Sequence, residues 1–451
     1  MSRKRKQQSL SVVYPNCAGI DVGGSEHWVA VEPQSCEQPV RKFGCFTADL
    51  ERMADWLAAQ GVRVVAMEAT GVYWIPLFEV LDARGFEVHL VNSRATRQVA
   101  GRKSDVLDCQ WIRQLMAHGL LRSAFRPADA ICHLRALVRQ RQIKVDDQSR
   151  SVLHMQKALT QMNIQLTNVL ADLAGKTGMA ILRAILAGER DPEVLARLRD
   201  RRVKADHATV ARSLHGNWRE EHLFALRQAL EQHDFLKNQI AACDAAIVDA
   251  LAAVASVPAA VPPVAKPLAR DKTRTKTQQE ALRQALFATF GVDLTAIPTL
   301  GVDTVLVLAA EIGPDLSRFP SCEHFCSWLA VAPPTRISGG KPLPGRGPKV
   351  FNRAGQALRQ AAANARNSQT FLGAAHRARL ARMGSKSAAI KATAHQLARL
   401  IYAMITKGQA YVERGIQAYE EEHLVRQLHH LRRKATRLGF QLIENPAAVA
   451  A

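Results

Sequence analysis

Four acidic residues occupy positions where carboxylates could hold a metal. Asp21 ends an apolar run and precedes glycines, and Glu68 ends a second apolar run. Asp105 and Asp108 are three residues apart, which places both on one face of a helix. A dense carboxylate cluster needs cations to neutralise it, and two Mg²⁺ ions about 4 Å apart would clamp the attacking and leaving oxygens of a phosphodiester. The alternative is that these acids are simply solvated at strand ends and on a helix face.

Ser338 lies between Arg336 and Lys341 in a segment rich in proline and glycine, for which we expect a flexible turn. A serine hydroxyl is a poor nucleophile unless a base or a metal activates it and cations stabilise the charge that develops. On the residues alone, Ser338 is either such a nucleophile or an ordinary turn residue.

Basic residues on and after this segment are candidates for contacts with phosphates. They are Arg336, Lys341, Arg346, Lys349, Arg353, Arg359 and Arg366. Arg359 and Arg366 are seven residues apart in an alanine-rich stretch, which predicts that they share one helix face. A solvated helix face is the alternative, but the excess of arginine over acid in this region favours nucleic-acid binding.

Short β-rich runs alternate with helical ones between residues 18 and 125, which indicates an α/β domain. Strands are expected at 18–22, 28–31, 62–67 and 87–91. Helices are expected at 50–60, 72–83 and 105–118. The four carboxylates then come from two strand ends and one helix, so they can converge.

Beyond residue 131 the β pattern disappears and apolar residues recur at alternating steps of three and four, which predicts a coiled-coil seam. The seam runs through Val152, Met155, Leu159, Met162, Leu166, Val169 and Leu173. A second helix with similar spacing carries Leu223, Leu226, Leu230, Ile240 and Ile247. The two arms pair either as an antiparallel hairpin or with another protomer, and an ordinary helical bundle is the alternative.

The segment between residues 257 and 280 contains several prolines, followed by basic residues that alternate with threonines. This composition is typical of an exposed linker. The expected organisation is an α/β domain over 14–126, a helical coiled-coil region over 127–256, this linker over 257–280, a mainly helical domain over 281–412 and a helical tail over 413–451.

The 451 residues include 61 Lys and Arg against 40 Asp and Glu, a formal net charge of +21. This charge favours a polyanion, and nucleic acid is a better candidate than a membrane surface because no lipidation signal or strongly basic amphipathic helix stands out. No apolar run approaches the roughly 20 residues of a membrane span and no secretory signal is evident, so we expect a cytoplasmic protein without a membrane partner. The eight scattered cysteines are expected to be reduced thiols.

Four motifs follow one another along the chain: Gly19-Ile-Asp-Val-Gly, Met67-Glu-Ala-Thr-Gly-Val-Tyr-Trp, Lys103-Ser-Asp-Val-Leu-Asp-Cys and Ile337-Ser-Gly-Gly-Lys. In this order they resemble the motifs of the DEDD transposases of the insertion-sequence-one-ten family. The resemblance extends over most of the chain, from Tyr14 to Tyr411.

This resemblance implies a ribonuclease H-like (RuvC-like) N-terminal domain, a coiled-coil insertion and a mainly helical C-terminal transposase domain. By matching position, it implies a metal-binding tetrad and a serine nucleophile, namely Asp21, Glu68, Asp105, Asp108 and Ser338. It further implies Mg²⁺ as the cofactor, with two ions, and donor and target DNA as substrates. A noncoding bridge RNA would specify both DNAs, and the protein would assemble as a homo-oligomer, a dimer of dimers with composite sites.

The sequence is therefore compatible with three functions. The leading hypothesis is an insertion-sequence transposase that cuts and rejoins DNA through a phosphoserine intermediate at a two-metal site. The first alternative is a RuvC-like, Mg²⁺-dependent nuclease in which metal-activated water cuts DNA and Ser338 is structural. The second is a catalytically silent RNA- or DNA-binding protein whose acidic cluster is incidental.

Overall fold

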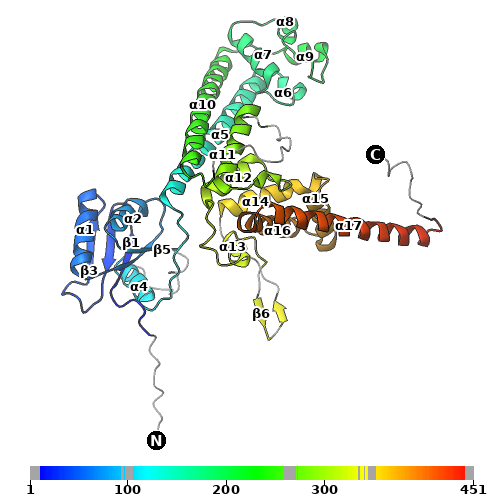
Figure 1. Cartoon of the computed structure of the whole chain (residues 1–451). Helices are drawn as coiled ribbons and strands as arrows, with labels where there is room; N and C mark the ends of the chain where they lie inside the picture. Colours follow the sequence, from blue (N-terminus) through cyan, green and yellow to red (C-terminus); the bar gives the residue numbers. More distant parts are fainter. Residues whose placement is uncertain are drawn as a thin grey trace. The chain divides into compact units, whose positions relative to one another are not determined.

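The computed structural model describes residues 11–92, 96, 105–257, 271, 273–333, 336–339, 341–343 and 352–441. Within these ranges, Asp105, Arg336 and Lys341 are among the residues described by their backbone alone. The chain divides into two compact units, Met1–Arg126 and Pro127–Ala451 (Figure 1). The finer division into five segments stays a prediction.

The first unit is built on one mixed sheet of five strands in the order β3-β2-β1-β4-β5. The strands are β1 (Cys17–Val22), β2 (Glu26–Ala30), β3 (Val40–Gly44), β4 (Val64–Glu68) and β5 (Glu87–Val91). β1 is antiparallel to β2 and parallel to β4, and β4 is parallel to β5. The four predicted strands are confirmed to within a few residues. β3 was not predicted, because this edge strand carries Arg41 and Lys42 instead of an apolar run.

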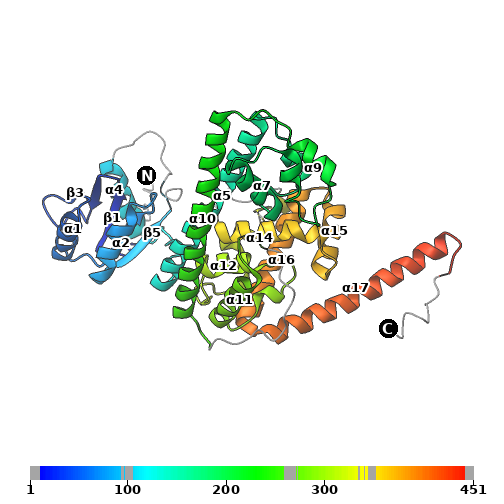
Figure 2. The same ribbon diagram turned by 90° about the horizontal axis from the view of Figure 1, so that it is seen from above.

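Helices cover both faces of this sheet (Figure 2). They are α1 (Thr47–Ala59), α2 (Trp74–Ala83) and α4 (Asp105–Ala117). Ile20 and Met67 point into the core shared with α1 and α2, whereas Cys17 and Ala66 face α4. Because side chains alternate along a strand, each strand serves two cores. This layered mixed sheet is compatible with the ribonuclease H-like fold that the sequence predicts.

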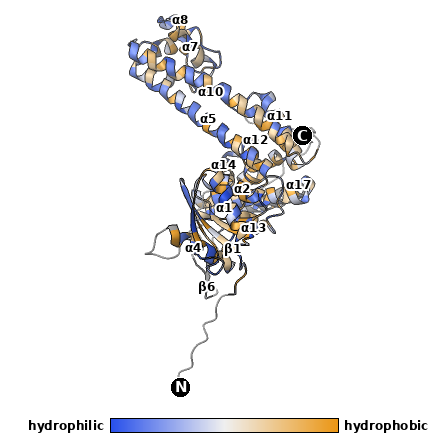
Figure 3. Ribbon diagram, turned by 90° about the vertical axis from the view of Figure 1, so that its left-hand side faces the viewer, coloured by the Kyte–Doolittle hydropathy of each residue, from blue (hydrophilic) through white to orange (hydrophobic). Residues whose placement is uncertain are grey.

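The second unit begins with two long helices that lie side by side, joined by short helices at their far end (Figure 1). The helices are α5 (Asp129–Gln161), α6 (Leu166–Val169), α7 (Lys176–Leu186), α8 (Pro192–Ala196), α9 (His207–Ser213) and α10 (Glu220–Ala253). Arg141 pairs with Asp244, and the Gln148 amide donates to the His233 carbonyl at 3.4 Å, so α5 and α10 run antiparallel. Both helices carry hydrophobic and hydrophilic residues along their length (Figure 3).

The predicted heptad seam is wrong beyond Gln161, where α5 ends. Asn163 adopts a left-handed conformation with φ of 57°, which asparagine tolerates better than most residues and which stops the helix. Met162, Leu166 and Leu173 are nevertheless buried, because the chain folds back and packs α6–α9 against the ends of α5 and α10. The antiparallel pairing is present, and a coiled-coil geometry stays a prediction.

The rest of the second unit is mainly helical, with one two-stranded hairpin. Its elements are α11 (Lys276–Phe290), η1 (Leu294–Ala296), α12 (Val302–Glu311), α13 (Cys322–Trp328), β6 (Arg336–Ser338), β7 (Lys341–Leu343), α14 (Arg353–Asn364), η2 (Ala365–Asn367), α15 (Phe371–Met383), α16 (Lys386–Lys407) and α17 (Gln409–Arg437). Among the described residues, no helix is both long enough and apolar enough to span a membrane.

Part of the predicted exposed linker is instead folded into this unit. The Arg274 side chain is only 1% exposed, and its Nε donates to Asp244 on α10 at 2.8 Å. Arg274 also pairs with Asp303 on α12, and α11 already begins at Lys276. The basic composition suggested exposure, but nearby aspartates from distant segments neutralise Arg274 and allow its burial.

Candidate functional site

Asp21 and Glu68 lie at the carboxyl ends of two adjacent parallel strands, β1 and β4. The register pairs Gly19 with Ala66 and Ile20 with Met67, so Asp21 and Glu68 come next on their strands. Alternation places both on the same face as Gly19 and Ala66, the face that α4 covers. Both residues are half-buried.

Close packing at Gly19 positions α4 on this face. A Cβ atom on Gly19 would lie 2.3 Å from the backbone nitrogen of Arg113 and 2.4 Å from the carbonyl oxygen of Cys109. The Cys17 thiol lies farther back on β1 and donates to the Arg113 carbonyl at 3.6 Å. The helix therefore runs against the direction of β1, and its first turn, with Asp108, lies at the end of the strand that carries Asp21.

The Cys109 thiol lies near enough to Asp21 and Asp108 to be affected by the charges of both. Burial raises the pKa of Cys109 to about 12, and the negative charges of Asp21 and Asp108 add to this rise because they disfavour a thiolate beside them. Acidic residues in the first turn of α4 are also favourable to the helix dipole.

Both carboxylate oxygens of Glu68 accept hydrogen bonds from threonine hydroxyls. Thr70 donates to Oε1 at 3.2 Å, and Thr96 donates to Oε2 at 3.3 Å. The indole nitrogen of Trp111, on α4, donates to the carbonyl of Thr96 at 3.0 Å. Glu68 is thus tied through Thr96 to the same helix that carries Asp108.

The carboxylate oxygens of the predicted tetrad suit a hard divalent cation, because Mg²⁺ prefers oxygen ligands of this kind. Three members of the predicted tetrad, Asp21, Glu68 and Asp108, share the α4 face, and Asp105 begins the same helix. Among the side chains that the structure describes, no three His, Cys, Asp or Glu groups are gathered closely enough to hold a metal ion, and the Asp105 side chain is not among those described. Neighbouring carboxylates repel one another until a cation neutralises them.

Ser338 ends strand β6 and is exposed, whereas the sequence predicted a flexible turn. Its register partner on β7 is Lys341, and Gly339 follows in the left-handed region with φ of 55°. Residues 336–338 pair with residues 341–343 as a short hairpin. Gly339 can adopt the positive φ that such a tight turn needs because it has no side chain. The hairpin therefore presents the serine next to a lysine position.

The remaining residues that were predicted to bind phosphate differ in where they lie and in how exposed they are. Arg353 begins α14 and is exposed, and Arg359 is half-buried on the same helix. Arg366 does not share that helix face as predicted, because α14 ends at Asn364 and Arg366 lies in the following 3-10 turn. Arg346 and Lys349 lie outside the described residues.

Gly19, Thr96 and Trp111 were not predicted as site residues, although they position it. The signal for Gly19 was present in the sequence: it precedes Asp21 by two residues and therefore shares its strand face. Thr96 and Trp111 had no such signal, because Thr96 contacts Glu68 and Trp111 contacts Thr96 only in the folded unit.

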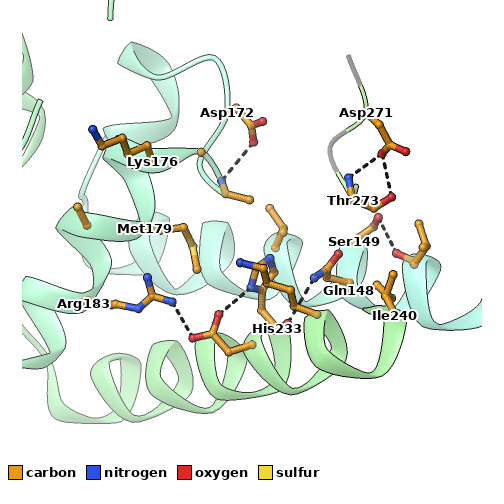
Figure 4. A pocket seen from close by; sticks show the side chains of 17 residues that line it. Gln148, Ser149, Asp172, Lys176, Met179, Arg183, His233, Ile240, Asp271 and Thr273 are labelled. Carbon is orange, nitrogen blue, oxygen red and sulfur yellow. Dashed lines mark hydrogen bonds and ion pairs between the residues drawn. The ribbon is translucent and has the colours of Figure 1, made fainter. Parts of the chain in front are cut away.

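A cavity of about 810 Å³ lies between α5, α7 and α10 in the second unit (Figure 4). Its lining includes three aspartates and three Lys or Arg residues: Asp172, Asp234, Asp271, Lys176, Arg183 and Lys237. Arg183 pairs with Asp234 at 2.8 Å, as Figure 4 shows. The balanced charges give this cavity no net attraction for an anion.

Two models of known protein families match this chain, one in its N-terminal half and one in its C-terminal half. A DEDD transposase model of the IS110 family matches residues 18–164, and a model described as transposase IS116/IS110/IS902 family matches residues 293–376. The first match contains the four candidate carboxylates and the second contains Ser338. No curated protein matches the chain. Because the two matches together cover about half of the sequence in the order that its motifs predict, the chain belongs to the IS110 family of insertion-sequence transposases.

Proposed function

We propose that this transposase cuts and rejoins DNA strands through a phosphoserine intermediate at Ser338, supported by a two-metal carboxylate site. The carboxylates are Asp21, Glu68, Asp105 and Asp108. The observation that supports this proposal is that Asp21 and Glu68 lie at the same end of the paired strands β1 and β4, on the face covered by α4, the helix that carries Asp108.

Each part of the chain has a defined role in this proposal. Two Mg²⁺ ions, when bound, would neutralise the carboxylates and stabilise the attacking and leaving oxygens. Thr96 and Thr70 keep the Glu68 carboxylate oriented toward this site. The Ser338 hydroxyl oxygen attacks the phosphorus of a phosphodiester, the bond between phosphorus and the strand's own oxygen breaks, and the proton of the serine hydroxyl passes to that leaving oxygen. A hydroxyl of the incoming strand then attacks the phosphoserine and frees Ser338.

Donor and target DNA and a noncoding bridge RNA are the proposed partners. The formal charge of +21 supports polyanionic partners, and exposed Arg353 and Arg366 add cations close in sequence to the serine hairpin. The proposal includes the homo-oligomer, a dimer of dimers, in which the serine of one protomer serves the carboxylates of another.

A covalent-trapping experiment tests the proposal. The full-length protein is incubated with Mg²⁺, RNA transcribed from the flanks of its element and labelled junction DNA, and adducts are resolved under denaturing conditions. We expect an adduct with the wild type, none with Ser338→Ala, and neither adduct nor cleavage with Asp21→Asn or Asp108→Asn. Ser149→Ala is the matched control, because Ser149 is exposed and bonds only within its own helix.

The alternative is a RuvC-like, Mg²⁺-dependent nuclease without a covalent intermediate. It is favoured by the fact that the carboxylate arrangement belongs entirely to the first unit, which does not contain Ser338. Cleavage that persists in Ser338→Ala without any adduct would establish this nuclease and remove the serine from the mechanism.

A further inference from the structure

A second cavity, of about 820 Å³, lies in the C-terminal helices, and its lining is strongly basic. It is formed by α13, residues 331–333, α15, α16 and the start of α17. Four of its lining residues are Lys or Arg, and the described lining contains no Asp or Glu: the four are Arg379, Lys391, Arg399 and Lys407. We call this cavity the basic groove.

Three of these four cations lie on α16, on the part of the helix that lines the groove. Lys391, His395, Arg399 and Lys407 follow one another at steps of four or eight residues. Each step of four residues rises about 6 Å and turns about 40° around the helix axis, so these residues follow a path of roughly 24 Å along α16 that winds across the groove. An extended path of cations fits a linear polyanion better than it fits a small anion.

The positive charges of the groove are only partly compensated within the described part of the chain, where the Glu323 carboxylate on α13 interacts with Arg399. Lys391, Arg399 and Lys407 form no ion pair there, whereas Arg379 is held in place by Thr393 at 3.2 Å and by Gln396. Burial lowers the pKa of Lys391, and the charge of Arg359 on α14 lowers it further. These groups therefore repel one another, and an anion would relieve that repulsion.

His395 lies on the same path and experiences the same excess of positive charge. Burial lowers its pKa, the cations Arg399 and Arg379 lower it further, and the carboxylate of Glu323 on α13 opposes them. The net direction of the His395 pKa is downward, with burial as the largest cause. The cavity in Figure 4 has no such excess of positive charge, because its three aspartates balance its three cations.

Two tyrosines line the groove, and they differ in how firmly they are held. The Tyr402 hydroxyl donates to the Phe319 carbonyl at 3.1 Å, and its ring packs against Phe325, so this side chain belongs to the core. Tyr411 is 48% exposed, with the Lys407 ammonium 4.7 Å from its ring centroid. An exposed aromatic ring beside cations is the combination that holds an unpaired base and its phosphates.

We propose that the basic groove binds one single strand of nucleic acid, with phosphates along the α16 cations and a base against Tyr411. Val331 and Pro333 in its wall precede strand β6, so the bound strand would lead toward the hairpin that carries Ser338. Only this last placement rests on the proposed function.

Binding is measured by fluorescence anisotropy over a series of NaCl concentrations, with full-length protein in EDTA so that no strand is cut. The probes are a labelled 20-nucleotide DNA, an RNA of the same sequence and the corresponding DNA duplex. For Lys391→Gln with Arg399→Gln we expect affinity for a single strand to fall roughly 5-fold per cation at 0.1 M salt. The slope of log K against log salt should fall by about 0.7 per cation.

Arg201→Gln with Arg212→Gln is the matched control, because both arginines are exposed in the α8–α9 region and outside the groove. Tyr411→Ala should weaken binding roughly 5-fold or more at an unchanged salt slope, and Tyr411→Phe should retain it. A constant slope in Tyr411→Ala separates loss of stacking from loss of phosphate contacts.

Loss confined to the DNA strand would identify a substrate strand, and loss confined to the RNA would identify a guide. The inference is overturned if the Lys391 and Arg399 variant keeps wild-type affinity and slope, or if its loss appears only with the duplex. The assay is carried out in EDTA and measures binding without cleavage, so the groove and the serine mechanism can fail independently.

Discussion

Glu68 illustrates how single side chains prepare the candidate metal site. Its two carboxylate oxygens accept hydrogen bonds from Thr70 and Thr96, and Trp111 in turn holds the Thr96 carbonyl. Groups that orient a metal-binding carboxylate determine how well it meets the ion, although they never touch the ion themselves. Thr96 is therefore a positioning residue in the proposed mechanism.

Thr96→Val tests this role, because valine has nearly the same shape and lacks the hydroxyl. We expect DNA cleavage to slow roughly 10- to 100-fold and the Mg²⁺ concentration needed for half-maximal rate to rise. Thr160→Val is the control, since its hydroxyl bonds only to the Gln156 carbonyl of its own helix. Wild-type cleavage and Mg²⁺ dependence in Thr96→Val would show that Glu68 needs no such support.

At the scale of elements, the contact between β1 and α4 decides whether the carboxylates meet. Gly19 is where the helix backbone approaches the strand, and the atoms that a Cβ would strike belong to the backbone of Cys109 and Arg113. A flexible side chain could move aside, but a helix backbone moves only as a whole. The packing of α4 thus requires that Gly19 has no side chain, and the proposed site depends on that packing.

Gly19→Ala should push α4 away from the sheet and displace Asp108 from Asp21. We expect a loss of about 1–3 kcal/mol in the free energy of unfolding, measured in urea, together with loss of DNA cleavage. Gly301→Ala is the matched control, because a Cβ there meets nothing within 4 Å. If Gly19→Ala cleaves DNA at the wild-type rate, the position of α4 does not matter for the chemistry.

At the scale of the whole molecule, ion pairs join the long helices of the second unit to its C-terminal helices. Arg141 on α5 and Arg274 both pair with Asp244 on α10, and Arg274 also pairs with Asp303 on α12. Nearby, Arg139 on α5 donates to Glu311 at the end of α12. The contacts of Arg141 and Arg139 join residues that are 103 and 172 positions apart, and those of Arg274 join residues that are 30 and 29 positions apart.

Arg274→Leu should remove the cation that Asp244, Asp271 and Asp303 share, which leaves the half-buried carboxylate of Asp244 with Arg141 as its remaining ion-pair partner. Removing one member of a buried pair costs about 3–5 kcal/mol, so we expect a loss of this size in urea unfolding of the full chain. Arg150→Leu removes an exposed pair with Asp147 and should change stability by less than about 1 kcal/mol. Equal effects of the two variants would show that the Arg274 network does not stabilise the unit.

The local pattern of the sequence was sufficient to predict most elements of the first unit. Apolar runs of four to six residues and helical spacing depend only on neighbouring positions, so β1, β4 and α4 were predicted within a few residues. The shared face of Asp21 and Glu68 also follows from such local rules, because alternation along parallel strands is periodic. The metal-binding and nucleophilic roles of the tetrad and Ser338 stay predictions.

Only the tertiary structure decided which charged residues are buried and where cations gather. Arg274 resembled part of an exposed linker until Asp244 and Asp303 were brought to it, and the α5 seam ended at Gln161 because the chain turns back into a shared core. The basic groove likewise combines residues from α13, α15, α16 and α17. Burial and electrostatic potential sum over neighbours in space, and a one-dimensional pattern does not contain those neighbours.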